Sequence, residues 1–90
     1  MGANARIAEQ LAALGDQVEL GMATPSEVRD TLLGHTEAVE RVPYAMVKDA
    51  QLLWGELSRA IDAGCEQEID VHALGDWLRG WASRVPREGA

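Results

Sequence analysis

Cysteine is nearly absent from this chain, and its scarcity excludes two kinds of small protein. Cys65 is the single cysteine, so the sequence holds neither a disulfide framework nor the ligand set of a usual structural zinc site. No apolar run approaches the ~18 residues that a membrane-spanning helix needs. The first residues include acidic side chains and no long apolar segment, so we expect no signal peptide and no membrane partner.

Positive charge is also scarce. The chain has 8 Lys and Arg against 15 Asp and Glu, which gives a formal net charge of -7 at pH 7. No segment of the chain is net basic, and an acidic chain repels phosphate backbones, so we expect no direct binding to nucleic acid. The same charge favours a partner with a basic surface. An alternative is that the carboxylates only keep the protein soluble.

Lysine occurs once, at Lys48, and the remaining basic residues are arginines. Together with the absence of phenylalanine and the abundance of alanine and glycine, this usage is typical of a GC-rich genome. We therefore expect a bacterial protein, or one encoded by a phage or mobile element, that resides in the cytoplasm.

Apolar residues recur at spacings of three and four in four successive segments, which is the period of an amphipathic helix. This pattern predicts helices at 4–20, 25–42, 43–63 and 70–85, followed by a short tail at 86–90. No segment shows the period-two alternation of a strand. Ninety residues suit one small domain, 1–90. Because short connections force neighbouring helices to run antiparallel, the sequence predicts an all-α fold, a small antiparallel four-helix bundle or a pair of helical hairpins.

Residues with defined capping roles mark the predicted helix ends. Thr24 and Glu27 have the spacing of a capping box before the second helix. Asn4 and Asp70 are predicted N-caps of the first and fourth helices. Gly15 interrupts the first helix, at a cost of about 1 kcal/mol relative to alanine, and we attribute it to the close approach of a neighbouring helix.

One apolar stripe along each helix predicts the core, and the third helix has the broadest stripe. The predicted core residues are, helix by helix, Ile7, Leu11, Leu14 and Val18; Val28, Leu32, His35, Val39 and Val42; Met46, Val47, Ala50, Leu53, Trp54, Leu57 and Ile61; Val71, Leu74, Leu78, Trp81 and Val85.

Residues suited to catalysis or metal binding are few and scattered. His35, His72 and Cys65 are the candidates, and no pattern brings them to one orienting carboxylate. The acidic stretch between Asp62 and Asp70 lacks the ligand spacing of a calcium loop, and no glycine-rich phosphate loop is present. We expect no catalytic residue, no cofactor and no metal site, and hence no enzyme.

Large apolar side chains that lie off the stripes are the most informative residues for function. Leu20, Leu33, Leu52 and Trp77 all point away from the core direction of their helices at 100° per residue. They are our candidate partner-binding residues, because tryptophan and leucine anchors characterise binding surfaces. Two alternatives remain open: tilted helices bury these side chains in a wider core, or a homodimer covers them.

Together these features predict a non-enzymatic protein–protein interaction module. We expect a small acidic adaptor, regulator or inhibitor of a larger bacterial assembly, which could use its acidic surface to block a basic groove. The alternative is a dimeric transcriptional regulator that contacts DNA through arginines such as Arg79 and Arg84 on the last helix.

Overall fold

The computed structural model describes residues 3–86, and the helices that it contains are those expected from the sequence. They are α1 (Ala3–Glu19), α2 (Pro25–Ala38), α3 (Tyr44–Asp62) and α4 (Val71–Ser83), with a short 3-10 helix, η1 (Glu66–Glu68), before α4. No strand occurs within residues 3–86, so the predicted all-α fold is confirmed. Apart from Pro86, the predicted tail lies outside the described residues. No helix in the described part is both long enough and apolar enough to cross a membrane.

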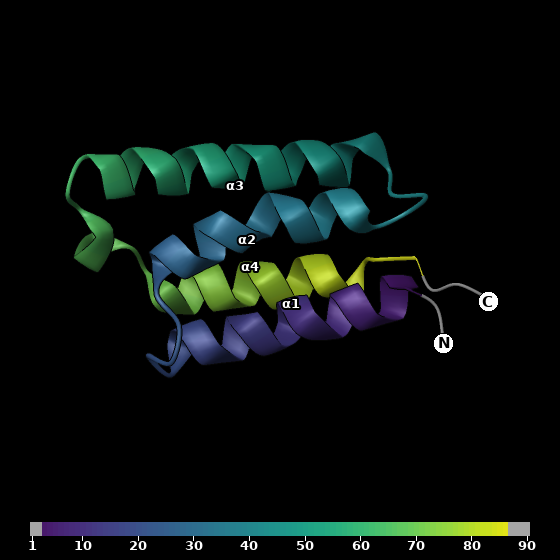
Figure 1. The fold of residues 1–90 in the computed structure, drawn as a ribbon, viewed down its shortest axis with the longest axis horizontal. Helices are drawn as coiled ribbons and strands as arrows, with labels where there is room; N and C mark the ends of the chain where they lie inside the picture. The colour runs from purple at the N-terminus through teal and green to yellow at the C-terminus, as the bar shows by residue number, and fades with distance from the viewer. Residues whose placement is uncertain (1–2, 87–90) are drawn as a thin grey trace.

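The helices form a four-helix bundle in which some neighbouring helices pack closely and others stand apart. In Figure 1, α3 runs along the top and α1 along the bottom, and all four axes follow the long dimension of the molecule. Helix α1 packs along α4, α2 packs along α3, and α1 also contacts α2. Helices α3 and α4 do not pack along each other. The Cα positions extend over 43 × 25 × 17 Å, so the bundle is flattened in cross-section.

The helix ends follow the local signals in the sequence. Thr24 Oγ1 accepts a hydrogen bond from the Glu27 amide at 3.1 Å, and Glu27 Oε1 accepts one from the Thr24 amide at 3.0 Å, so the predicted capping box is confirmed. Asp70 caps α4 by accepting hydrogen bonds from two amides of its first turn. Gly21 and Gly64 take φ values of 76° and 78° at the ends of α1 and α3, a conformation that favours glycine.

Helix α2 ends earlier than predicted, at Ala38 instead of residue 42, and Asn4 explains the difference. Asn4, predicted as an N-cap, is instead buried inside α1. Its side-chain amide donates to the carbonyl oxygens of Glu40 and Pro86, both at 2.9 Å, and its Oδ1 accepts from the Glu40 amide at 3.0 Å. These hydrogen bonds hold Glu40 outside α2. The next residue, Arg41, has a left-handed φ of 61°.

Most of the predicted stripe residues are buried, seven are partly buried, and Trp54 is exposed. His35 is partly buried, and the neighbouring Thr36 is buried. Thr36 tolerates burial because its hydroxyl donates to the Leu32 carbonyl at 3.0 Å. Trp54, predicted in the core, is 39% exposed. The core placement of Trp54 was therefore wrong, whereas the most deeply buried large apolar residues are all predicted ones, namely Trp81, Leu11, Leu32, Leu78, Val18 and Val28.

Glycine lets α1 and α4 come together. A Cβ atom on Gly15 would lie 2.9 Å from the carbonyl oxygen of Gly75, closer than a carbon atom can approach, so the predicted close approach at Gly15 is confirmed. On the opposing helix, a Cβ atom on Gly75 would collide with the Glu19 side chain. The two helix backbones are therefore in near contact at this level.

A cluster of charges centred on Arg79 ties the same two helices together. The Arg79 guanidinium contacts Glu19, Asp16 at 2.9 Å and Asp76 at 2.6 Å. Glu19 also lies 3.1 Å from His72 Nδ1. Hydrogen bonds from Arg79, and secondarily from His72, hold the pKa of the Glu19 carboxyl below its ordinary value. These ion pairs add to the packing at the glycines.

Candidate binding groove

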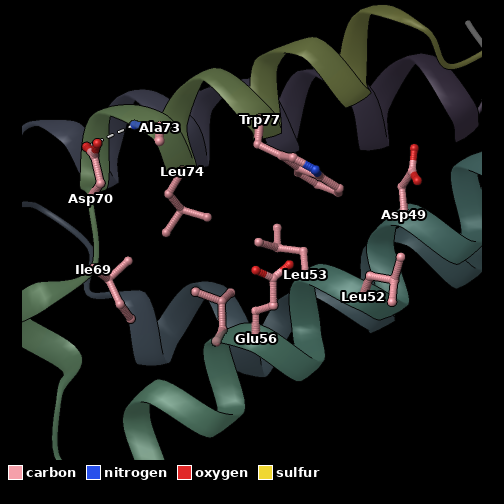
Figure 2. A pocket seen from close by; sticks show the side chains of 10 residues that line it. Asp49, Leu52, Leu53, Glu56, Ile69, Asp70, Ala73, Leu74 and Trp77 are labelled. Atoms are coloured by element: carbon pink, nitrogen blue, oxygen red, sulfur yellow. Dashed lines mark hydrogen bonds between the residues drawn. The ribbon is translucent and has the colours of Figure 1, made fainter.

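An open groove lies between α3 and α4, where the two helices stand apart (Figure 2). Its volume is about 530 Å³, within the range of protein ligand sites. Side chains from both helices point into it. Its lining residues are Asp49, Leu52, Leu53, Glu56, Leu57, Ile69, Asp70, Ala73, Leu74 and Trp77.

The α3 wall of the groove is a single stripe of the helix. Asp49, Leu52, Leu53 and Glu56 have the spacing i, i+3, i+4, i+7, which places them on one face. This face is one flank of the broad apolar surface of α3, whose other side packs against α2. Leu53 is partly buried against the core, whereas Leu52 is 57% exposed. The wall thus extends from the partly buried Leu53 to the exposed Leu52, and no helix among the described residues covers it.

The α4 wall repeats the same spacing with Asp70, Ala73, Leu74 and Trp77. Leu74 is buried and belongs to the core cluster, and Trp77 is partly buried against it. The Trp77 ring stacks on Trp81, with ring centroids 6.3 Å apart and an interplanar angle of 17°. Stacking on a buried ring fixes the orientation in which Trp77 faces the groove.

Contacts within the fold hold both ends of the groove in place. At one end, the buried Trp81 Nε1 donates to the Met46 carbonyl at 2.9 Å and joins α4 to α3. At the other end, η1 is anchored to α2, because the Ser26 amide and hydroxyl donate to Glu66 Oε2 at 3.0 and 2.8 Å. Ile69 follows η1 and lines that end. The groove is therefore preformed.

The charged groups of the groove are all acidic. Asp49, Glu56 and Asp70 line it, and no Lys or Arg does so within the described residues. Asp70 is engaged in capping α4, and Asp49 lies 3.6 Å from Arg84 Nη2. Glu56 makes no ion pair with any described residue. An apolar trough edged by carboxylates favours a ligand that is apolar on one face and positively charged at its margins.

The structure brings together two of the four candidate partner-binding residues. Leu52 and Trp77 face the same groove from opposite walls. Leu20 is 74% exposed but lies just after α1, and Leu33 is half-buried on α2; neither lines the groove.

The sequence did not show which carboxylates form the acidic margin, nor that the stripe leucines Leu53 and Leu74 line a groove. The signal was present, since Asp49 and Glu56 bracket the two leucines Leu52 and Leu53 at helical spacing. The same spacing is also expected where the buried face of a helix meets its exposed face. The spacing alone therefore does not identify a groove.

The candidates for chemistry do not form a site. His72 lies beside Glu19, Cys65 Sγ is 3.8 Å from the Ala63 carbonyl, and His35 is partly buried on α2. Among residues 3–86, no group of three or more His, Cys, Asp or Glu side chains is arranged to hold a metal ion. That the protein is not an enzyme stays a prediction.

Comparisons with protein-family models, curated proteins and solved structures find no match to this chain. The functional interpretation therefore depends on the geometry of the groove.

Proposed function

We propose that this protein is a non-enzymatic protein-binding module whose α3/α4 groove receives apolar side chains of a positively charged partner. The observation that carries the proposal is Leu52, a leucine 57% exposed opposite Trp77 in a groove edged by carboxylates. Exposed apolar surface costs about 25 cal/mol per Å² relative to burial. A partner that covers Leu52 and Trp77 recovers that free energy.

The arrangement has the features of a protein-binding surface. An apolar centre containing a tryptophan, surrounded by polar groups, is where binding energy concentrates in interfaces. Because Trp77 is held by stacking on Trp81, little conformational entropy is lost when it is covered. We therefore place the partner-binding role on Leu52 and Trp77, with Asp49, Glu56 and Asp70 attracting a basic partner.

A second copy of this chain suits the groove less well than a different protein. In a symmetric dimer through this face, the carboxylate margin of one protomer would approach the same margin of the other. Like charges brought together oppose association. We therefore favour a basic heterologous partner, and with it the role of a cytoplasmic adaptor, regulator or inhibitor of a larger assembly.

The DNA-contacting alternative has weaker support. Its two candidate arginines are already engaged by acidic groups: Arg79 contacts three carboxylates, and Arg84 lies near Asp49. Phosphate contacts would have to displace those partners, against the negative charge of the whole chain.

The test is affinity capture from the native host with matched variants. Wild type, Leu52→Asp, Trp77→Ala and the control Leu20→Asp are each checked for an unchanged circular dichroism spectrum. We expect one basic protein to be captured by wild type and Leu20→Asp and lost with both groove variants, and then to bind the purified protein directly. Equal capture by all four proteins would overturn the proposal.

A further inference from the structure

We infer that the occupant of the groove is an amphipathic α-helix of the partner, about two to three turns long, with an apolar face and Lys or Arg at its edges. This inference rests on the proposed function and adds the conformation and pattern of the partner segment. It follows from the length of the groove, from the nature of its walls and from the placement of its carboxylates.

The length of the groove matches two helical turns. On α3 the wall runs from Asp49 to Glu56, and on α4 from Asp70 to Trp77; at 1.5 Å per residue, each stretch is about 10.5 Å long. A helix with apolar residues at i, i+3 or i+4, and i+7 presents them over the same distance. An extended segment covers it in about three residues and turns only one or two side chains toward the groove.

The walls discriminate further between a helix and an extended segment. An extended peptide needs partners for its backbone N–H and C=O groups, which an open sheet edge supplies. Both walls here are helices, and the described residues contain no strand. A peptide pressed against Leu52, Leu53 and Leu74 in extended form would leave backbone groups unsatisfied, whereas a helix satisfies its own.

The carboxylates define where positive charge belongs on the occupant. Asp49 and Glu56 are seven residues apart on one margin, so Lys or Arg at i and i+7 along one edge of a bound helix would face both. Asp70 lies on the opposite wall and attracts a cation on the other edge. Glu56 has no ion-pair partner among the described residues, so we expect it to contribute most to the preference for basic residues.

The experiment is selection from a displayed library of random 16-residue peptides on wild-type protein, with counter-selection against Leu52→Asp. We expect the selected peptides to carry apolar residues at i, i+3 or i+4, and i+7, with enrichment in Lys and Arg. A selected peptide should gain helical circular dichroism on binding. Its affinity should fall at least about tenfold with Leu52→Asp and about two- to fivefold with Glu56→Gln. Glu37→Gln, on the exposed surface of α2, is the matched control and should bind as wild type does.

Three results would overturn the helical occupant: period-two or proline-rich peptides, peptides that Leu52→Asp binds equally well, or no binders at all. Each leaves the proposed function standing as long as the host protein is still lost with Leu52→Asp and Trp77→Ala. A homodimer of the wild-type protein that Leu52→Asp dissociates would instead contradict both proposals, because a second copy would then occupy the groove.

Discussion

Helix α4 packs closely against α1 on one side and faces α3 across the groove on another, and the two sides differ in character. Toward α1, Gly15 meets Gly75 at near-contact distance and Arg79 ties the helices through carboxylates. Toward α3, Leu52 and Trp77 stand on opposite sides of an open groove. The glycines lie where α1 and α4 touch, and Leu52 and Trp77 lie where α3 and α4 do not. The two sides of α4 therefore differ in how closely the neighbouring helix packs against them, and not in apolar content. The α1 side is structural, and the α3 side is suited to binding.

This comparison implies that substitutions on the two sides should have different effects. Changes on the α1 side should reduce the free energy of unfolding, and changes at the groove margin should reduce partner binding.

The two stacked tryptophans offer the sharpest contrast. Trp81→Ala should lower the free energy of unfolding by about 3–5 kcal/mol, the usual cost of removing a buried tryptophan. Trp77→Ala should cost no more than about 1–2 kcal/mol, because its ring is partly exposed. Urea titration followed by circular dichroism measures both.

If Trp81→Ala is unfolded in water, the conservative pair still separates the two positions. Trp81→Phe loses the hydrogen bond to the Met46 carbonyl and should be less stable than Trp77→Phe. Equal losses at the two positions would remove the distinction between core and groove on α4.

The second prediction concerns the contact between Gly15 and Gly75. Gly15→Ala should lower the free energy of unfolding by about 1–3 kcal/mol, because its Cβ would press on the Gly75 carbonyl and force the helices apart. Gly80→Ala on α4 is the matched control: nothing lies within 4 Å of a Cβ there. This control should gain up to about 1 kcal/mol from helix propensity. A stabilised Gly15→Ala would show that the contact is loose.

Leu52→Asp should leave the free energy of unfolding within about 0.5 kcal/mol of wild type, as expected for an exposed position outside the core. Leu20→Asp should behave alike, so that the two variants differ only in partner binding. Thermal and urea unfolding of both proteins provide the measurement. A loss above about 2 kcal/mol at Leu52 would assign that side chain to the core.

Lowering the pH should weaken the contact between α1 and α4, and this effect should be smaller than those of the preceding predictions. The folded pKa of Glu19 lies below its unfolded value, so its contribution to stability is complete above about pH 4.5 and is lost as the pH falls through the lowered pKa. Glu19→Gln should flatten that part of the stability curve between neutral and acid pH. An unchanged curve in Glu19→Gln would indicate that solvent screens the pair fully.

Local signals in the sequence predicted the helices well, and long-range contacts account for the errors. The capping box at Thr24 and the cap at Asp70 act within a few residues, and both were identified. The early end of α2 depends on Asn4, which bonds to Glu40 across 36 positions. No local pattern contains that contact.

Only part of the groove could be predicted from the sequence, because long-range packing positions the rest. Leu52 and Trp77 could be identified as lying off the stripes of their own helices. That they face each other depends on how α3 divides its broad apolar surface between α2 and the open side. Local spacing does not determine this division, because the packing of all four helices sets it.

The most direct test of the binding groove is a ¹⁵N-labelled NMR spectrum of the protein, recorded with and without the captured partner or its binding segment. We predict that the largest shifts fall on the amides of Leu52, Leu53 and Leu74 and on the indole of Trp77, with Leu20 unchanged. Shifts confined to α1 and the outer face of α2, with the groove signals unmoved, would contradict the account.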